Sequence, residues 1–166
     1  MEAGANSLTD HASADEWVRV VEPAICAVEA GAVDWFWPRV SHWIDDALHQ
    51  SVMHELPLDE VYTGCKDGSY LLLAVRLGND LTGCAVMAAS TDPQGRPYLA
   101  VICCGGERVQ RWLSLLVRTC RLLAAEMGAR EIVALGRPGW RPLLAGLGCK
   151  LRAVVMVLDV EGERDG

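Results

Sequence analysis

Apolar and polar positions alternate along the first third of the chain in a pattern that predicts one strand and one long helix. Residues 16–23 fit a first strand that ends at Pro23, and the residues just after it fit either a strand or a helix. Across residues 34–52, apolar side chains recur at near-helical spacing, and Asp34 is a possible N-cap. A short helical turn is expected after Pro57.

The remaining pattern predicts a sheet interrupted by helices. The expected elements are strands at 69–77, 81–90, 98–104, 131–136 and 150–160, a long amphipathic helix at 107–127 and a short helix at 138–148. A tight turn joins the first two of these strands. Because a helix separates 98–104 from 131–136, these two strands should be parallel neighbours.

The element order predicts a single α/β (α+β) domain with a mixed central sheet and helices on both faces. We place this domain at residues 15–160, between a mobile polar tail at 1–14 and a second at 161–166.

Charge and composition narrow the function classes. The 166 residues carry a net charge of −7, which disfavours an extended nucleic-acid surface. A local basic cluster is nevertheless expected on the outer face of the long helix, formed by Arg108, Arg111, Arg118 and Arg121.

No apolar run approaches the ~20 residues of a membrane span, and the N-terminus has no signal-peptide pattern. The seven cysteines fit buried free thiols in a reducing compartment.

Two side-chain groups in residues 34–52 leave alternatives open. His42, Asp46 and His49 share one helical face, which fits either a metal or acid–base site or an ordinary solvated surface. The aromatic group contains more rings than one helix face can bury, so part of it could form a protein-binding interface, with core packing or a nucleotide or acyl platform as alternatives. Its members are Trp35, Phe36, Trp37 and Trp43.

Two segments carry a resemblance to a known fold. "YLAVICCGGERVQRWLSLLVRTCRLLAAEMGAREIVALG" and "GWRPLLAGLGCKLRAVVMVL" resemble the Gcn5-related N-acetyltransferase (GNAT) fold over roughly residues 58–160. More narrowly, "ALGRPGW…LLAGLGC" resembles a GNAT-like group encoded by tailed bacteriophages.

The resemblance implies a place for acetyl-CoA. In this fold the cofactor lies where two parallel strands splay apart, and its pyrophosphate rests on backbone N–H groups of a glycine-rich loop at a helix N-terminus. One alignment puts Gly105 and Gly106 at the glycine positions, with the carboxylate of Glu107 beside the anion; the other puts Gln110 and Trp112 there. Both alignments predict a poor cradle. If a cofactor binds, the expected residues are Gly105, Gly106, Arg108, Val109, Gln110 and Arg111.

The catalytic positions implied by the resemblance are also unfavourable. Strands 81–90 and 98–104 contain no carboxylate, and Leu144 occupies the position where the fold often has a tyrosine that acts as general acid. Four residues elsewhere could substitute, namely Tyr98, Glu107, Glu131 and Cys149. We therefore expect no catalytic residue, no metal and no cofactor.

These observations favour a non-catalytic, protein-binding or structural component of a phage particle. Its expected partners are other virion proteins, and its expected location is the virion or the host cytoplasm. The alternative is an acyl-CoA-dependent N-acetyltransferase with an atypical loop, which would use acetyl-CoA.

Overall fold

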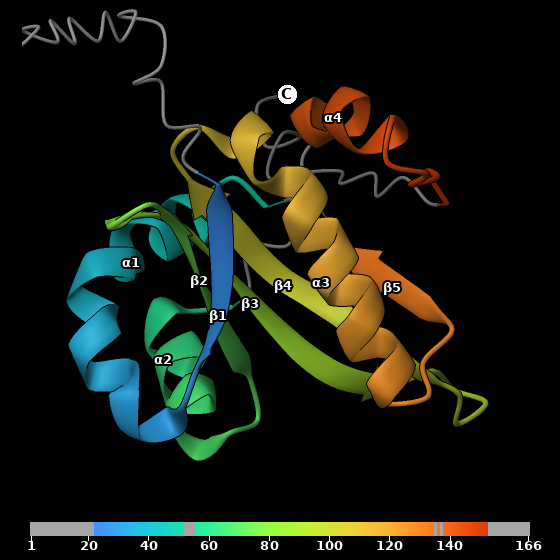
Figure 1. Cartoon of the computed structure of the whole chain (residues 1–166). Coiled ribbons are helices and arrows are strands. Elements are labelled where there is room, and N and C mark those ends of the chain that lie inside the picture. The colour runs from blue at the N-terminus through green and yellow to red at the C-terminus, as the bar shows by residue number, and fades with distance from the viewer. Residues whose placement is uncertain (1–21, 52–55, 135, 137, 153–166) are drawn as a thin grey trace, which may run out of the picture.

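The computed structural model describes residues 22–51, 56–134, 136 and 138–152. In this part of the chain a five-stranded sheet carries helices on both faces (Figure 1). Its strands lie side by side in chain order: β1 (Pro23–Val28), β2 (Leu71–Leu77), β3 (Asp80–Thr91), β4 (Pro97–Gly106) and β5 (Glu131–Ala134). Neighbours are antiparallel except β4 and β5, which are parallel, so the predicted mixed sheet and parallel pair are confirmed.

The helices are α1 (Val33–His49), α2 (Leu58–Asp67), α3 (Leu113–Glu126) and α4 (Arg141–Ala145). Single 3-10 turns occupy Ala30–Ala32, Val109–Arg111 and Pro138–Trp140. Helices α1 and α2 cover one face of the sheet, and α3 covers the other (Figure 1). No helix in the described residues is long and apolar enough to cross a membrane.

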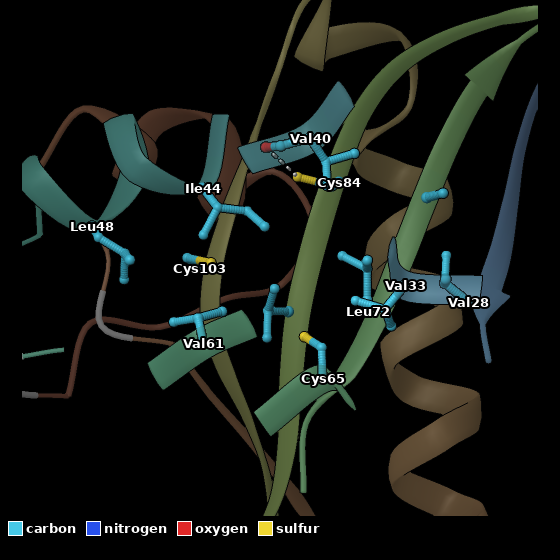
Figure 2. Packing of buried hydrophobic residues seen from close by; sticks show 12 residues of the cluster. Val28, Val33, Val40, Ile44, Leu48, Val61, Cys65, Leu72, Cys84 and Cys103 are labelled. Carbon is cyan, nitrogen blue, oxygen red and sulfur yellow. Dashed lines mark hydrogen bonds between the residues drawn. The ribbon is translucent and has the colours of Figure 1, made fainter. Parts of the chain in front are cut away.

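One core lies between the sheet and the α1–α2 pair. Val40, Ile44 and Leu48 recur every four residues on α1 and are buried against Cys84 of β3 and Cys103 of β4 (Figure 2). The Cys84 thiol approaches the carbonyl of Val40, with Sγ and O 3.9 Å apart. Helix α1 thus crosses the sheet, with its C-terminal half over β4.

A second core lies between the sheet and α3. Leu113, Leu116, Cys120 and Ala124 form the buried stripe of α3, and Trp112, just before the helix, is fully buried with them. Because β2 and β3 contribute side chains to both cores, their runs are apolar almost throughout, as the sequence predicts for strands buried on both faces.

The N-terminal boundaries differ from the expected ones. Strand β1 begins at Pro23 instead of ending there, which suits a proline because the first residue of an edge strand needs no ladder N–H; residues 16–21 lie outside the described residues. Asp34 is not the N-cap of α1, a position held by Ala32. Asp34 instead accepts hydrogen bonds from Tyr62 Oη (2.6 Å) and Lys66 Nζ (2.7 Å) of α2.

Three further boundaries are corrected. Helix α2 has 10 residues instead of a single turn and is followed by Gly68, its C-cap, whose φ of 83° is left-handed. The long helix starts at Leu113, not at residue 107, because β4 continues to Gly106. The short helix predicted at 138–148 is a 3-10 turn followed by α4, which ends at Ala145. Most of the strand predicted at 150–160, and both predicted tails, lie outside the described residues.

Candidate functional site: the open half of β4 and the loop before α3

Strand β4 divides into two halves at the point where β5 leaves it. The pairs between β4 and β5 run from Tyr98 and Glu131 to Val101 and Ala134. Residues 98–101, the paired half, therefore have a strand on each side, whereas residues 102–106, the open half, extend beyond the last pair with β5. Strand β3 accompanies both halves, as far as the pair of Gly83 with Gly106.

A β-bulge marks the boundary between the two halves. Val86 of β3 is opposite Cys103 and Met87 is opposite Val101, so Ile102 has no partner in the register. A bulge of this kind bends the strand and increases its twist. The bend in β4 thus coincides with the end of its pairing with β5.

The two adjacent glycines lie inside the open half and are required by packing. A Cβ on Gly105 would lie 2.7 Å from the carbonyl oxygen of Trp43, so the backbone of α1 rests directly on β4. Gly106 has a φ of 147°, and a Cβ there would collide with the Cα of Gly83 and the carbonyl oxygen of Thr82.

The loop between β4 and α3, residues 107–112, forms a tight turn at the end of the open half. The N–H of Glu107 donates to Thr82 O (2.7 Å) and the N–H of Trp112 to Val109 O (3.1 Å). Among the loop and cap hydrogen bonds of the described residues, none is donated by the N–H of Arg108, Val109 or Gln110. Backbone N–H groups just before a helix can bind an anion, and the helix dipole favours it.

Trp112 supports this loop from the core side. Its side chain is 0% exposed, and its Nε1–H donates to the carbonyl of Glu107 (2.8 Å). The indole lies against Gly83, where a Cβ would be 2.7 Å from Cζ2. The indole therefore fills the space between loop and sheet. Trp112, which one alignment placed at a glycine position of the loop, is thus a core residue.

The loop brings Arg108, Val109, Gln110 and Arg111 into one turn, while Gly105 and Gly106 precede them in β4. The side chains of Glu107 and Arg108 are both exposed, and Arg108 is left-handed, with a φ of 52°. The basic face predicted for one long helix is thus divided between this loop and α3. On α3, Arg121 Nη2 donates to Leu147 O (2.7 Å), which ties α3 to the chain after α4.

Two of the candidate acid–base residues lie far from the open half. Tyr98 and Glu131 are paired at the beginning of the paired half, about 13 Å along the strand from Ile102. Arg152 Nη1 donates to Glu131 Oε2 (2.8 Å), which lowers the pKa of that carboxyl. Leu144 packs against the core beneath α3.

The thiols around β4 are unreactive structural groups. Burial raises the pKa of Cys103, in the open half, to about 12, and raises that of Cys65 and Cys120 to about 11. These thiols are protonated at neutral pH and are poor nucleophiles. Cys26 and Cys149 are free and exposed, and Cys149 lies beyond α4.

The four aromatic residues of α1 differ in burial. Phe36, Trp37 and Trp43 pack against the core beneath α1, and the Trp37 ring lies 5.1 Å from that of Tyr62. Trp35 is 61% exposed. A protein-binding role for this cluster stays a prediction.

The exposed polar face of α1 forms a local contact. His49 Nδ1 lies 2.9 Å from Asp45 O and 3.3 Å from Asp45 Oδ1, so it interacts with Asp45 instead of Asp46.

The sequence interpretation overlooked Thr82 and Gly83, which hold the loop from β3. A glycine within an apolar strand indicates a close backbone approach, and that signal was present in "LTGCAV".

Solved structures share this architecture. The ribosomal-protein-alanine N-acetyltransferase of Brucella melitensis biovar Abortus 2308 is 16% identical with a TM-score of 0.61, over 82% of this chain and 98% of that one. A predicted acetyltransferase of Clostridium acetobutylicum, solved with acetyl-CoA, is 10% identical with a TM-score of 0.61, over 86% of this chain and 99% of that one. An aminoglycoside acetyltransferase from an uncultured soil metagenomic sample is 10% identical with a TM-score of 0.60, over 84% and 97%. No family model and no curated protein matches the sequence.

The chain therefore has the GNAT fold, and two of the expectations change. The expectation that no cofactor is used is corrected, because a protein of the same fold was solved with acetyl-CoA. The similar structures are enzymes, so they fit the acetyltransferase alternative better than a structural virion role. The bacteriophage assignment stays a prediction that these comparisons do not support.

Proposed function

We propose that this chain is an N-acetyltransferase that takes its acetyl group from acetyl-CoA. The observation that carries the proposal is the open half of β4, which leaves the sheet's parallel pair and leads into a turn before α3. The resemblance and the similar structures support the same class of enzyme.

The residues present fit this cofactor. The N–H groups of Arg108, Val109 and Gln110 and the Arg108 guanidinium would hold the pyrophosphate, and backbone groups of the open half would hold the pantetheine amides. Glu107 is the one residue of this loop that opposes an anion. When bound, acetyl-CoA would supply a thioester: the acceptor nitrogen would form a bond to the acetyl carbon, the carbon–sulfur bond would break, and CoA would leave as a thiolate that takes up the proton lost by the nitrogen.

The open half offers the acceptor no acid or base. Its side chains are Ile102, Cys103 and Cys104, followed by two glycines, and burial raises the pKa of both thiols. An acceptor amine would therefore lose its proton to water before it attacks. The rate should rise with pH up to the pKa of the amine itself.

Glu107→Gln tests the position of the cofactor by calorimetry. Removing this exposed charge should tighten acetyl-CoA binding roughly two- to fivefold, because a carboxylate near a pyrophosphate repels it through solvent. Glu126→Gln is the matched control, since Glu126 is equally exposed but lies at the other end of α3 and should leave the affinity unchanged. Equal effects of both substitutions would place the cofactor elsewhere.

Acetyl transfer is then measured with labelled acetyl-CoA and a panel of amines. A radiolabel is preferable to a thiol reagent, because the exposed Cys26 and Cys149 would react with the reagent. Binding without transfer to any amine would support a cofactor-binding protein and refute the enzyme. Absence of binding at about 1 mM acetyl-CoA would refute both.

A protein-binding component of a phage particle is the second candidate, and the exposure of Trp35 is the observation that favours it. Mass spectrometry of purified particles tests it directly. Stoichiometric presence of the chain would support this role, and its absence from particles would exclude it.

A further inference from the structure

A cavity lies on the α1 face of the sheet, beside the turn between β2 and β3. This hairpin cavity has a volume of about 710 Å³. Its walls come from β1, the first turns of α1, the β2–β3 hairpin and the start of the loop after β4. It lies toward β1 and β2 and not toward β5, and it meets the loop proposed to hold acetyl-CoA only at Glu107 and Arg108.

Three guanidinium groups line the hairpin cavity. Arg39 stacks on the ring of Trp35, with Cζ 3.9 Å from the ring centroid, and its Nη1 donates to Trp35 O (2.6 Å). Arg76 and Arg108 are exposed, and their side chains make no ion pair or hydrogen bond with any other residue that the structure describes. These two cations are therefore available to a ligand.

Two carboxylates share the same walls. Asp80 and Glu107 line the cavity, and within the described ranges their side chains have no ion-pair or hydrogen-bond partner either. Charges of both signs thus face one space without neutralising each other through contact. Three guanidinium groups and two carboxylates line the cavity, so a ligand that carries a positive and a negative charge can pair with both kinds of group.

Trp35 and Phe36 add an apolar wall. Their rings meet edge to face with centroids 4.7 Å apart. An aromatic wall beside paired polar groups is the composition of a small-molecule site. It also gives the exposed indole of Trp35 a role that requires no protein partner.

We propose that the hairpin cavity binds a small zwitterion: a free amino acid, or a molecule with the same amine and carboxylate. The carboxylate would bind Arg76 of β2, the amine would bind Asp80 of β3, and an apolar side group would lie against Trp35 and Phe36. This inference does not rest on the proposed acetyltransferase activity, since it needs neither acetyl-CoA nor the open half of β4.

The test is calorimetric titration of the full chain with the standard amino acids at up to about 10 mM. L-Phenylalanine is then compared with N-acetyl-L-phenylalanine, which lacks the cationic amine, and with L-phenylalaninamide, which lacks the carboxylate. Loss of either charge should weaken binding by about tenfold or more. Binding of N-acetyl-L-phenylalanine as tight as that of the free amino acid would overturn the zwitterion in favour of a plain anion.

Arg76→Gln locates the site. It should weaken binding by about tenfold, because a guanidinium–carboxylate contact is lost from an otherwise unchanged fold. Arg118→Gln, an equally exposed arginine on α3, should change nothing. Equal affinity in Arg76→Gln and the unmodified chain would place the ligand elsewhere, and failure of every amino acid to bind would refute the proposal.

Discussion

The two halves of β4 have adjacent sequences and opposite structural roles. The paired half has β3 on one side and β5 on the other, so its backbone N–H and C=O groups form hydrogen bonds within the sheet. The open half keeps β3 but extends beyond the register with β5, and both of its glycines are pressed against neighbouring backbone. Residues 102–106 are thus held through one face and one edge, and within the described residues their other edge has no pair with β5.

This contrast explains why the open half needs such close packing. Beyond its last pair with β5, the open half is held by α1 at Gly105 and by β3 at Gly106. Trp112 supports the loop that follows. Substitutions there should alter the open half while leaving the paired half intact.

Trp112→Ala should have the largest effect. Loss of a fully buried indole should lower the free energy of unfolding by about 3–5 kcal/mol, through the cavity it leaves. Trp112→Phe retains much of the packing but loses the Nε1–H to Glu107 O bond, and should cost less, about 1–2 kcal/mol. Denaturant unfolding measures both. Equal losses would show that the hydrogen bond matters more than the packing.

Gly106→Ala should have an intermediate effect, about 2–3 kcal/mol, because a side chain there is strained by the positive φ and collides with β3. Gly31→Ala is the matched control: nothing lies within 4 Å of a Cβ at that position, and the change should stay within about 0.5 kcal/mol. Thermal unfolding compares the two variants. A Gly106→Ala protein as stable as the control would mean that β3 can move aside.

Asp34→Asn should have the smallest effect and should leave the open half untouched. Hydrogen bonds from Lys66 and Tyr62 lower the pKa of Asp34. A carboxylate with a lowered pKa stabilises the fold above its unfolded pKa and loses that contribution as pH falls. The variant should therefore be less stable than the parent at neutral pH, and the two should become equally stable once the pH has fallen below the lowered pKa of Asp34. A stability gap that persists in acid would contradict this origin.

Much of the fold follows from the sequence because its patterns are strong. The spacing of Val40, Ile44 and Leu48 predicts α1, and the crossover between two apolar runs predicts the parallel pair of β4 and β5. Capping at Asp34 was predicted wrongly, since a tertiary contact with Lys66 competes for that carboxylate.

The candidate site was harder to read, for a physical reason. The pair Gly105 and Gly106 has the composition of a phosphate loop, but its neighbours Trp43 and Gly83 come from elements far away in the chain. The bulge at Ile102 lies in a uniformly apolar run, where no residue type reveals a change of register. The hairpin cavity depends on four separate segments, which no local pattern brings together.

The short ladder between β4 and β5 has a consequence for how the molecule fluctuates. Strand β5 has four residues, all of them exposed, and is joined to β4 by a long crossover, whereas β2, β3 and β4 form consecutive antiparallel pairs. Breaking a few parallel hydrogen bonds costs less than disrupting that meander, so local opening should begin at β5 and its amides should exchange with solvent early. Such an opening of β5 would widen the space beside Ile102 without global unfolding.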